Sequence, residues 1–342
     1  MARVTVSIPT YNRCSYLREA IESVLTQTFD DFQLLITDNG SQDGTQELVA
    51  RYSAKDRRVV YHRFPTNQGP APNWIYGITW PKTELVALLP DDDLWLPEHL
   101  EHAVRAMEEN PEASLYGCIT EAFGEYPNEA FHPYYRPLWL ADCTSRTVYD
   151  PRQCYTPWLL GSPMAPPSIV LRRRMVDQNM LYNDNNFSSG DYMFYGQMAL
   201  CGSMVFDPVV RVKYRWHAGN DTHRTMGTRL GAAQQRYVIR ALATLAMERK
   251  ALDPEAMVNE VEHWPAAPVG NMVVALAVLD APPPLRQAAF RIFKRRPVVD
   301  ASPHMSRHYR LAHKIGAWYL SIADLMDRML GRWWHPVVPR SL

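Results

Sequence analysis

Apolar segments of two kinds alternate along the first third of the chain. Segments rich in β-branched and other apolar side chains predict strands, and they are residues 4–9, 32–38, 59–64, 84–90 and 113–119. Segments in which apolar side chains recur three or four positions apart predict helices, and they are residues 14–29, 43–54, 70–80 and 97–110. This alternation predicts an α/β fold with a Rossmann-like, mostly parallel sheet flanked by helices.

Polar residues follow each of the first four predicted strands. They are PTYNR (9–13), DNGS (38–41), NQG (67–69) and DDD (91–93). In open parallel sheets, ligands bind beyond the carboxyl ends of the strands. We therefore expect the four stretches to meet at one edge of the sheet and to form a ligand site there.

Three adjacent carboxylates, Asp91, Asp92 and Asp93, follow the fourth predicted strand. Like charges this close repel each other unless a cation or hydrogen-bond donors offset them. Mg²⁺ and Mn²⁺ suit such a place, because they take oxygen ligands and keep positions open for phosphate oxygens. The alternative is a solvated turn in which Asp93 assists the start of the helix near Pro97. The triplet by itself is compatible with both.

Composition narrows the class of protein. The 342 residues suit one large or two ordinary domains, and a 46% apolar content allows a sizeable core. Equal numbers of basic and acidic residues, 36 each, give no overall attraction to nucleic acid. Five cysteines without Cys-x-x-Cys spacing favour a reduced, intracellular protein. We expect no signal peptide and no membrane-spanning helix, and hence a cytoplasmic location.

Five stretches, taken in order, resemble the family-two nucleotide-sugar glycosyltransferases with the GT-A fold. They are SIPTYNR, TDNGSQDGT, NQGPAPNWIYGI, LLPDDDLW and SSGDYMFYGQMALCG. Each is weak alone, whereas their order and spacing are specific, and the resemblance covers roughly residues 3–222. It implies a metal-dependent, inverting transfer of sugar from a UDP- or dTDP-sugar to an acceptor hydroxyl. The product would be a polysaccharide, a glycolipid or a glycosylated natural product.

The resemblance implies a donor site built from the first four stretches. The ring of Tyr11 would lie against the base. The family usually has two acids where this chain has Asp38 and Asn39, and Asn39 can still accept from the base through its carbonyl oxygen. Ordinary turns, and a helix cap at Asn12, are the alternative. The implied donor-binding residues are Pro9, Thr10, Tyr11, Asn12, Arg13, Asp38, Asn39, Gly40, Ser41, Asn67, Gly69, Asp91 and Asp92.

The resemblance also implies a Mn²⁺ or Mg²⁺ site. The family's metal carboxylate aligns best with Asp92, while Asp91 would reach the ribose and Asp93 would support the metal. In this register Pro90 replaces the first acid of an Asp-x-Asp motif. The alignment therefore leaves open, by one position in the sequence, which acid touches the metal. KYRWHAGNDTH (213–223) resembles the Tyr-Arg-x-His-x-x-Asn stretch that often closes the family's catalytic domain. There His217 could join the metal or the diphosphate, and Arg215 could reach a phosphate. A packed or surface histidine is the alternative. The implied metal ligands are Asp92, Asp93 and His217.

Asp191, in GDYMFYGQMALCG, is implied as the catalytic base. An acceptor hydroxyl must lose its proton while it attacks the anomeric carbon, and a carboxylate can take that proton. A carboxylate at the start of a helix is also typical of an N-cap. A single base, with no second carboxylate pair for a covalent intermediate, favours inversion.

Two regions have no motif. Residues 123–167 carry the aromatic side chains Tyr126, His132, Tyr134, Tyr135, Trp139 and Trp158, which could stack on the sugars of an acceptor or pack on one another. Beyond about residue 225 the pattern becomes helical, so we divide the chain into a catalytic domain (1–224) and a helical region (225–342).

The helical region is basic from about residue 285 and contains Trp318, Trp333 and Trp334. Such helices could bind the inner face of a membrane peripherally. They could instead pack on the catalytic domain or on a second subunit in a homodimer.

Two other functions are compatible with a parallel sheet and metal-binding acids. A nucleotidyltransferase would usually carry a Gly-rich, basic phosphate loop, and PTYNRCSY is not one. A nucleotide-binding protein without catalysis would bind nucleotide and metal but transfer nothing. The presence of both metal and base candidates favours an enzyme. Its partners would be the nucleotide sugar and a carbohydrate, lipid-linked or small-molecule acceptor.

Overall fold

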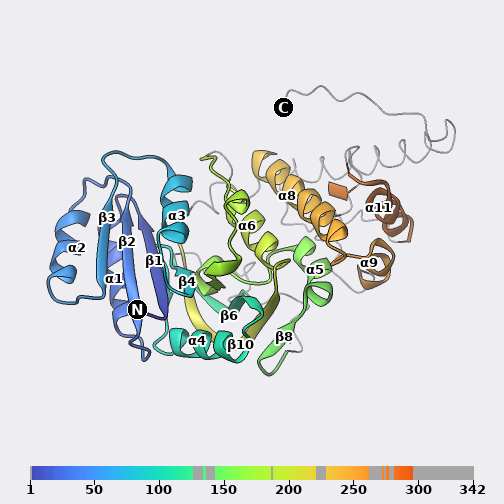
Figure 1. The fold of residues 1–342 in the computed structure, drawn as a ribbon. Helices are drawn as coiled ribbons and strands as arrows, with labels where there is room; N and C mark the ends of the chain where they lie inside the picture. The colour runs from blue at the N-terminus through green and yellow to red at the C-terminus, as the bar shows by residue number, and fades with distance from the viewer. Residues whose placement is uncertain are drawn as a thin grey trace. The chain divides into compact units, whose positions relative to one another are not determined.

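A computed structural model describes most of the chain, and Figure 1 shows it as a ribbon. The described residues are 2–125, 134–135, 143–185, 188–220, 229–261, 272, 275–276 and 281–295. They belong to two compact units. The first comprises Met1–Cys154 and Ser162–Arg224, and the second comprises Tyr155–Gly161 and Thr225–Leu342.

The first unit is built on one ten-stranded sheet. Eight strands run in the order β3 (Val59–Arg63), β2 (Phe32–Asp38), β1 (Val4–Thr10), β4 (Leu85–Leu88), β9 (Val170–Arg172), β6 (Ala113–Gly124), β10 (Ser203–Trp216) and β5 (Leu94–Trp95). Two more strands lie off this path, with β7 (Tyr134–Tyr135) paired to β6 and β8 (Thr147–Tyr149) paired to β10. Four predicted strands and their β-α order are confirmed in β1 to β4, and β6 is the fifth.

The first four strands in this order are parallel, so their carboxyl ends lie at one edge. At that edge Thr10 is paired with Asp38, which is paired with Arg63. The rest of the sheet is mixed, because β9 enters antiparallel between β4 and β6. The sequence pattern predicted a mostly parallel sheet. It did not indicate the antiparallel strand β9, because a strand of three residues is too short to show a periodic pattern.

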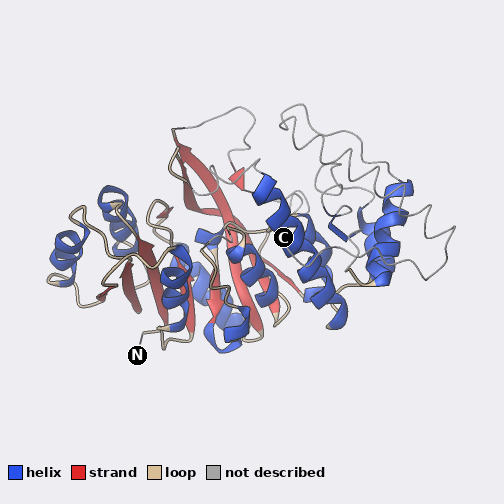
Figure 2. Cartoon of the chain, turned by 90° about the horizontal axis from the view of Figure 1, so that it is seen from above, coloured by secondary structure: helices blue, strands red, loops and turns tan. Residues whose placement is uncertain are grey.

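Helices cover both faces of the sheet, as the pattern predicted (Figure 2). The helices α1 (Cys14–Leu25), α2 (Thr45–Ser53) and α4 (His99–Glu109) share one apolar core with the side chains of Val4, Val6 and Ile8. The intervening side chains of β1 face α3 (Pro70–Thr79), where Ser7 Oγ donates to Gly77 O at 2.7 Å. Gly77 allows this close approach, since a Cβ there would lie 3.1 Å from Ser7 Cβ.

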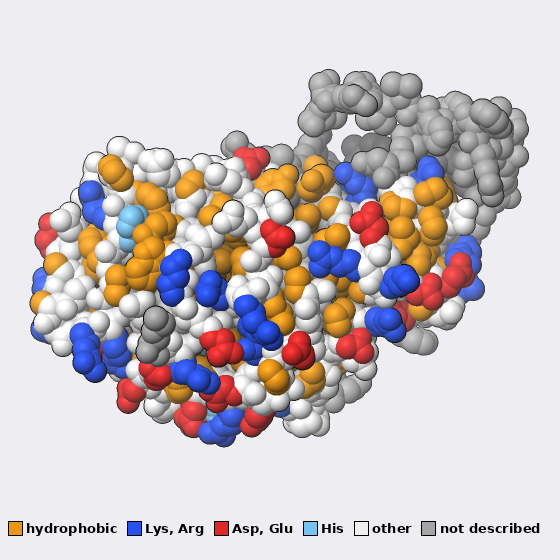
Figure 3. All heavy atoms as spheres, viewed as in Figure 1, with side chains coloured by type: hydrophobic (Ala, Val, Ile, Leu, Met, Phe, Trp, Pro, Cys, Tyr) orange, Lys and Arg blue, Asp and Glu red, His pale blue; other side chains and the backbone are white. Residues whose placement is uncertain are grey.

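Two further helices of the chain lie between β8 and β10. They are α5 (Pro151–Leu160), whose last residues belong to the second unit, and α6 (Gly190–Met198). The short 3₁₀ turns η2 (Pro166–Ser168), η3 (Arg173–Met175) and η4 (Gln178–Met180) precede α6. On the face shown in Figure 3, basic and acidic side chains are interspersed, so neither sign of charge dominates it.

The described elements of the second unit beyond residue 225 are helices. They are α8 (Arg229–Glu248), α9 (Pro254–Glu260) and α11 (Pro283–Arg295). Arg291 of α11 pairs with Glu255 of α9, and Arg295 donates to Asn259 Oδ1 at 3.0 Å. No helix within the described ranges combines the length and the apolar content that crossing a membrane requires.

Several predictions fall on residues outside the described ranges. These are the membrane or subunit contact through Trp318, Trp333 and Trp334, and an acceptor surface that includes Tyr126, His132 and Trp139. Of the remaining aromatic residues in that segment, Trp158 is fully buried. It therefore packs within the protein and presents no open face to a sugar.

Candidate active site

The four polar stretches meet at the carboxyl ends of the strands, as the sequence predicted. Thr10 Oγ1 donates to Asp91 Oδ2 at 2.7 Å, which joins the end of β1 to the acidic triplet after β4. The backbone N–H of Asn12 donates to Ser41 Oγ at 2.9 Å, which joins the ends of β1 and β2. Asn39 bonds the 67–69 turn after β3. We call this edge of the sheet the rim.

All three acids of the triplet are buried, so they do not form a solvated turn. The side chains of Asp91, Asp92, Asp93, Arg13, Arg215 and His217 interact closely, and we call these six residues the aspartate cluster. The helix that follows begins at His99 with Glu98 as its N-cap, so Asp93 does not cap it. Burial of the acids therefore requires charge compensation from elsewhere in the fold.

Arg13 joins the first two acids. Its Nη1 lies 3.1 Å from Asp91 Oδ1 and 2.7 Å from Asp92 Oδ2, and its Nη2 donates to Gly219 O at 2.9 Å. Burial and the neighbouring charge of Asp92 raise the pKa of Asp91 to about 7. The guanidinium of Arg13 thus supplies, at the rim, the positive charge that two adjacent carboxylates require.

His217 bonds the same carboxylate from β10's side of the rim. Its Nε2 lies 3.0 Å from Asp92 Oδ2, and its Nδ1 accepts from the backbone N–H of Gly219 at 3.1 Å. Because Nδ1 is an acceptor, the neutral ring carries its proton on Nε2 and donates it to Asp92. Asn220, three residues further on, holds the turn by accepting from His217 N–H at 2.6 Å.

Arg215 fixes the backbone of the triplet. Its own N–H donates to Asp93 Oδ1 at 2.7 Å, and its Nε donates to Asp92 O at 2.8 Å. Its Nη2 pairs with Glu19 at 2.6 Å, and its guanidinium lies over the ring of Tyr16. These contacts turn Arg215 toward the protein, so its role here is to position the acids.

Asp93 is the most deeply buried of the acids. Its Oδ2 accepts no hydrogen bond within the described residues. Burial, together with the charge of Asp92, raises the pKa of Asp93 well above its ordinary value. Burial and the charge of Asp92 thus disfavour the ionised forms of Asp91 and Asp93.

At this edge Asp92, with Asp91 beside it, is the candidate carboxylate for a Mn²⁺ or Mg²⁺ ion. Such ions are commonly held by one or two carboxylates together with phosphate oxygens and water. Within the described ranges, no three His, Cys, Asp or Glu residues are grouped so that they could hold a metal. Asp93 directs an oxygen to Arg215 N–H and His217 donates to Asp92, so the three predicted ligands do not form a ready-made triad.

On the other half of the rim, Asp38 is enclosed by donors. It accepts from Ser41 N–H at 2.8 Å and from the Tyr61 hydroxyl at 2.5 Å, and Arg63 Nε lies 3.5 Å away. The turn that follows is tight, since Gly40 has a φ of +79° and a Cβ there would lie 3.0 Å from the backbone of Thr66. Asp38 thus holds the turn after β2 in place.

The stretch after β1 leaves an aromatic ring open. Pro9 lies within β1, one residue before its end, and is partly buried, whereas Tyr11 is exposed, as a base-stacking ring requires. Asn12 has a φ of 53° and accepts from Gln42 N–H at 2.8 Å. It does not cap α1, because Asp43 accepts the free N–H of Cys14 at 2.8 Å.

Asn39, Asn67 and Gly69 also meet at the rim. Asn39 Nδ2 donates to Asn67 Oδ1 at 2.9 Å and to Gly69 O at 2.8 Å. Its Oδ1 accepts from Gln68 N–H at 2.8 Å. Asn39 is 3% exposed, so in this state its side chain faces the 67–69 turn and not an open pocket.

Asp191 lies in the first turn of α6, with Ser189 as the N-cap. Its Oδ1 accepts from the N–H of Tyr192 at 2.7 Å, and burial raises its pKa. Phe194 of α6 packs edge-on against Trp74 of α3, with ring centroids 5.0 Å apart. The helix that carries Asp191 is therefore fixed to the helix that begins at the rim.

Three residues of the site, Asn220, Tyr61 and Asn185, were absent from the sequence-based set. Asn220 is the last position of the Tyr-Arg-x-His-x-x-Asn stretch, whose spacing indicates it. Arg215 of the same stretch, which the resemblance implies could reach a phosphate, contacts Asp92 O and Glu19 in the structure. Tyr61 lies on β3, and no signal in the sequence pairs it with Asp38. Asn185 donates to Gln68 O at 2.9 Å and accepts from Ala71 N–H at 3.0 Å, and only its polar surroundings, YNDNNFSSGD, hint at a surface loop.

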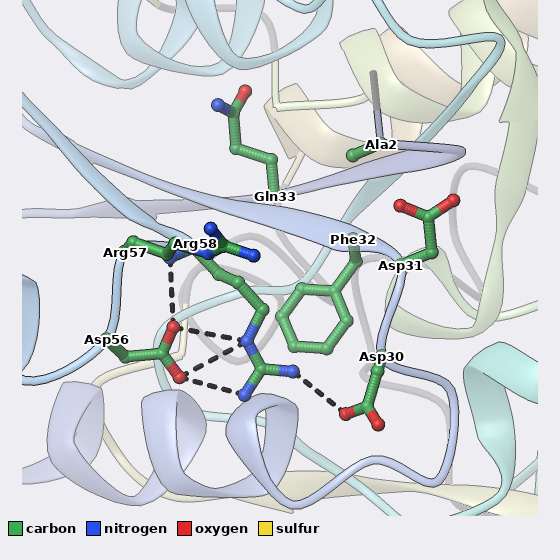
Figure 4. A pocket seen from close by; sticks show the side chains of 8 residues that line it. All are labelled: Ala2, Asp30, Asp31, Phe32, Gln33, Asp56, Arg57 and Arg58. Carbon is green, nitrogen blue, oxygen red and sulfur yellow. Dashed lines mark hydrogen bonds and ion pairs between the residues drawn. The ribbon is translucent and has the colours of Figure 1, made fainter.

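A separate hollow lies at the opposite edge of the sheet (Figure 4). Its lining comes from the residues that precede or begin β1, β2 and β3, which are Ala2, Asp30, Asp31, Phe32, Gln33, Asp56, Arg57 and Arg58. Arg58 pairs there with Asp56 at 2.8 Å and with Asp30 at 3.1 Å. Because the charge of Arg58 is already compensated by these two acids, Arg58 is not available to bind an anionic ligand in the hollow. The rim is therefore the better candidate site.

Comparison with known proteins agrees with the motifs and the fold. The model of Glycosyl transferase family 2 matches residues 5–181. The chain belongs to this family. An uncharacterized glycosyltransferase of Rickettsia bellii (strain RML369-C) is 38% identical over 109 residues, which are 32% of this chain and 16% of that protein. Another, from Rickettsia typhi (strain ATCC VR-144 / Wilmington), is 26% identical over 241 residues, which are 65% of this chain and 67% of that protein.

The match to several relatives is partial: the chain spans 16% to 18% of the length of the Rickettsia bellii protein and of two similar proteins from Rickettsia felis and Rickettsia conorii. Similar solved structures match a larger share of both chains. TarS of S. aureus (residues 1–349, in complex with UDP) has a TM-score of 0.55 at 16% identity, with 99% of this chain and 95% of that chain covered. Mannosyltransferase PcManGT from Pyrobaculum calidifontis, in complex with GDP-Man and Mn²⁺, has a TM-score of 0.53 at 14% identity, with 96% and 87% covered. These likenesses confirm the GT-A fold.

Proposed function

We propose that this family-two protein is an inverting glycosyltransferase that moves a sugar from a nucleoside diphosphate sugar to an acceptor hydroxyl. UDP and dTDP are the expected donor nucleotides. The acceptor would be a carbohydrate, a lipid-linked molecule or a small molecule. The neighbours in complex with UDP and with GDP-Man support a nucleoside diphosphate as the donor's leaving group.

The observation that carries the proposal is the aspartate cluster at the carboxyl end of β4. There Asp92 Oδ2 lies within 3.0 Å of both Arg13 and His217, and the exposed Tyr11 directly follows β1 at the same rim. A rim of this composition offers a stacking surface for a base and a place where diphosphate charge can be offset. Neither a solvated turn nor a structural ion pair requires this combination.

Asp191 would act as the general base. The acceptor oxygen forms a bond to the anomeric carbon while the bond from that carbon to the diphosphate oxygen breaks. The acceptor's proton passes to Asp191, and the bonding electron pair leaves with the diphosphate. A partly buried carboxylate with a raised pKa is the stronger base that this step requires. One displacement with one base inverts the anomeric configuration.

Arg13 and Asp92 would serve the leaving group. Arg13 supplies positive charge at the mouth of β1 and β4, where the diphosphate would leave. A Mn²⁺ or Mg²⁺ ion bound at Asp92 would add positive charge to the same diphosphate. His217 would keep Asp92 in position through its hydrogen bond, and Asp93 would do so through the backbone of Arg215.

Incubation with a panel of nucleoside diphosphate sugars tests the proposal. With Mn²⁺ present, we expect one or two donors to release nucleoside diphosphate. For an α-linked donor, NMR of the earliest product should show a β-linked sugar. Release from none of the donors across a range of added acceptor sugars would contradict transfer, and an α-linked product would contradict inversion.

A further inference from the structure

We propose that Asn39, Asn67 and Asn185 form an asparagine clamp that positions the turn at residues 67–71, and that Asn39 serves the donor site by holding this turn and not by contacting the base. The role at the donor site rests on the proposed function. The clamp itself is defined by hydrogen bonds that need no ligand.

Asn39 holds the turn from inside the protein. Both hydrogens of its amide nitrogen are used, one by Asn67 Oδ1 at 2.9 Å and one by Gly69 O at 2.8 Å. Its oxygen accepts from Gln68 N–H at 2.8 Å. The backbone carbonyl and the backbone N–H fix which end of the amide is which, because the reversed amide would face oxygen to oxygen. Only an amide satisfies both sides of this arrangement.

Asn185 holds the same turn from the solvent side. Its Nδ2 donates to Gln68 O at 2.9 Å, and its Oδ1 accepts from Ala71 N–H at 3.0 Å. Ala71 lies in the first turn of α3, where backbone N–H groups have no partner within the helix. Asn67 completes the turn by accepting from Gly69 N–H at 2.7 Å. Three backbone N–H groups therefore each depend on one asparagine oxygen.

Gly69 shows how closely the clamp encloses the turn. Its φ is +88°, which favours glycine, and a Cβ there would lie 2.1 Å from Asn185 Nδ2. The Asn185 side chain thus lies where any other residue at position 69 would place its own. This contact ties the turn to the segment that precedes α6, and α6 begins at Gly190 with Asp191 next.

The position of Asn39 in the sequence favours a different role, since the family often has a base-reading acid there. In this chain the side chain is 3% exposed and committed to the turn, so a base could reach it only by breaking these bonds. The clamp instead sets where the turn lies at the rim, where the donor would bind. Loss of Asn39 should then weaken every nucleotide alike and leave the preference among bases unchanged.

Residue-resolved hydrogen exchange of the free protein tests the clamp. Asn39→Ala should speed exchange at Gln68, and Asn185→Ala should speed exchange at Ala71. Each change should be about threefold to tenfold, the range expected when one hydrogen bond is lost. Asn179→Ala, at an exposed position in η4, is the matched control and should change neither. Unchanged exchange at Gln68 and Ala71 in both variants would overturn the clamp.

Calorimetric titration with UDP, dTDP, GDP and ADP tests the donor role. Asn39→Ala and Asn185→Ala should raise each measurable Kd, with the smaller rise in Asn185→Ala because Asn185 is exposed. The ratio of the Kd values for UDP and GDP should stay within about twofold of the wild-type ratio. A change in that ratio above about fivefold in Asn39→Ala alone would show that Asn39 reads the base, and unchanged Kd values would also overturn the donor role.

The two proposals can fail separately. If the wild-type protein binds none of these nucleotides, the proposed function fails and so does the donor role of the turn. The exchange rates would still decide whether the clamp holds the turn. If nucleotides bind and exchange in the variants is unchanged, the proposed function stands and the clamp fails.

Discussion

The two halves of the rim satisfy their polar groups in different ways. In the aspartate cluster, buried acids bond to Arg13 and His217, and Arg13 lies between two carboxylates. In the asparagine clamp, neutral amides satisfy one another and the backbone. Removal of a cation from the first leaves an unbalanced buried charge, whereas removal of an amide from the second costs hydrogen bonds alone. The charged groups of the aspartate cluster are therefore suited to bind a charged ligand in place of one another. The amides of the asparagine clamp are suited to keep the turn in place without a ligand.

Asp191 belongs to neither the aspartate cluster nor the asparagine clamp. A change at Asp191 should therefore affect turnover without affecting donor binding at either half of the rim. Asp191→Asn should lower kcat by about 10²- to 10⁴-fold, the range for losing a general base. The Kd for the donor nucleotide should change little, because the proposed role of Asp191 is at the acceptor. Steady-state kinetics together with calorimetric titration would measure both, and near-normal turnover in the variant would contradict the assignment.

The pH dependence of the wild-type enzyme sharpens the same assignment. Burial raises the pKa of Asp191, and the base must be unprotonated to act. The rate should therefore fall as the pH falls through a pKa above the ordinary value of about 3.9. In a profile of kcat/KM against pH, this acidic limb should be missing from Asp191→Asn. A limb that persists unchanged would belong to another group.

Arg13→Met tests the charged half of the rim. The variant leaves the carboxylates of Asp91 and Asp92 side by side without their shared cation. We expect a loss of about 2 kcal/mol in the free energy of unfolding, less than the roughly 3–5 kcal/mol of a fully buried pair because Arg13 is partly exposed. Added Mn²⁺ should restore more stability to this variant than to the wild type.

Chemical denaturation with and without Mn²⁺ would measure both effects. Arg13→Lys is the matched control, since it keeps the positive charge and loses the planar guanidinium with its second contact to Gly219 O. An Arg13→Met protein as stable as the wild type would show that the carboxylates do not depend on this cation.

Asn39→Asp tests the neutral half by introducing the acid that the family usually carries. The carboxylate would face Gly69 O and Asn67 Oδ1, so two hydrogen bonds become repulsive contacts. We expect a loss of about 1–2 kcal/mol. Folding should raise the pKa of the new carboxyl group, so the loss is absent below the pKa of the unfolded state and grows as the pH rises above it.

Denaturation at several pH values would measure that loss, with Asn179→Asp on the exposed η4 turn as the control. Equal stability of Asn39→Asp and the control at neutral pH would show that the buried amide is not required. The clamp would then lose its main physical support.

Much of the rim could be predicted from the sequence, because it depends on local patterns. Apolar runs predicted β1 to β4. Because the carboxyl ends of parallel strands share one edge, the sequence also predicted that Thr10 and Asp91 lie close together. The partners of the acids could not be predicted in the same way. His217 is 125 positions from Asp92, and Asn185 is 117 positions from Gln68. No periodicity carries such contacts, which arise only when β10 and the segment before α6 return to the rim.

Titration of the wild-type protein and Asp92→Asn with UDP, in the presence and absence of Mn²⁺, tests the central claim most directly. Asp92→Asn keeps the shape of the side chain and removes the charge at the centre of the aspartate cluster. We predict that Mn²⁺ strengthens UDP binding to the wild type by at least about tenfold, or 1.4 kcal/mol, and that this gain disappears in the variant. Absence of UDP binding to the wild type, or a full Mn²⁺ effect in Asp92→Asn, would contradict the account.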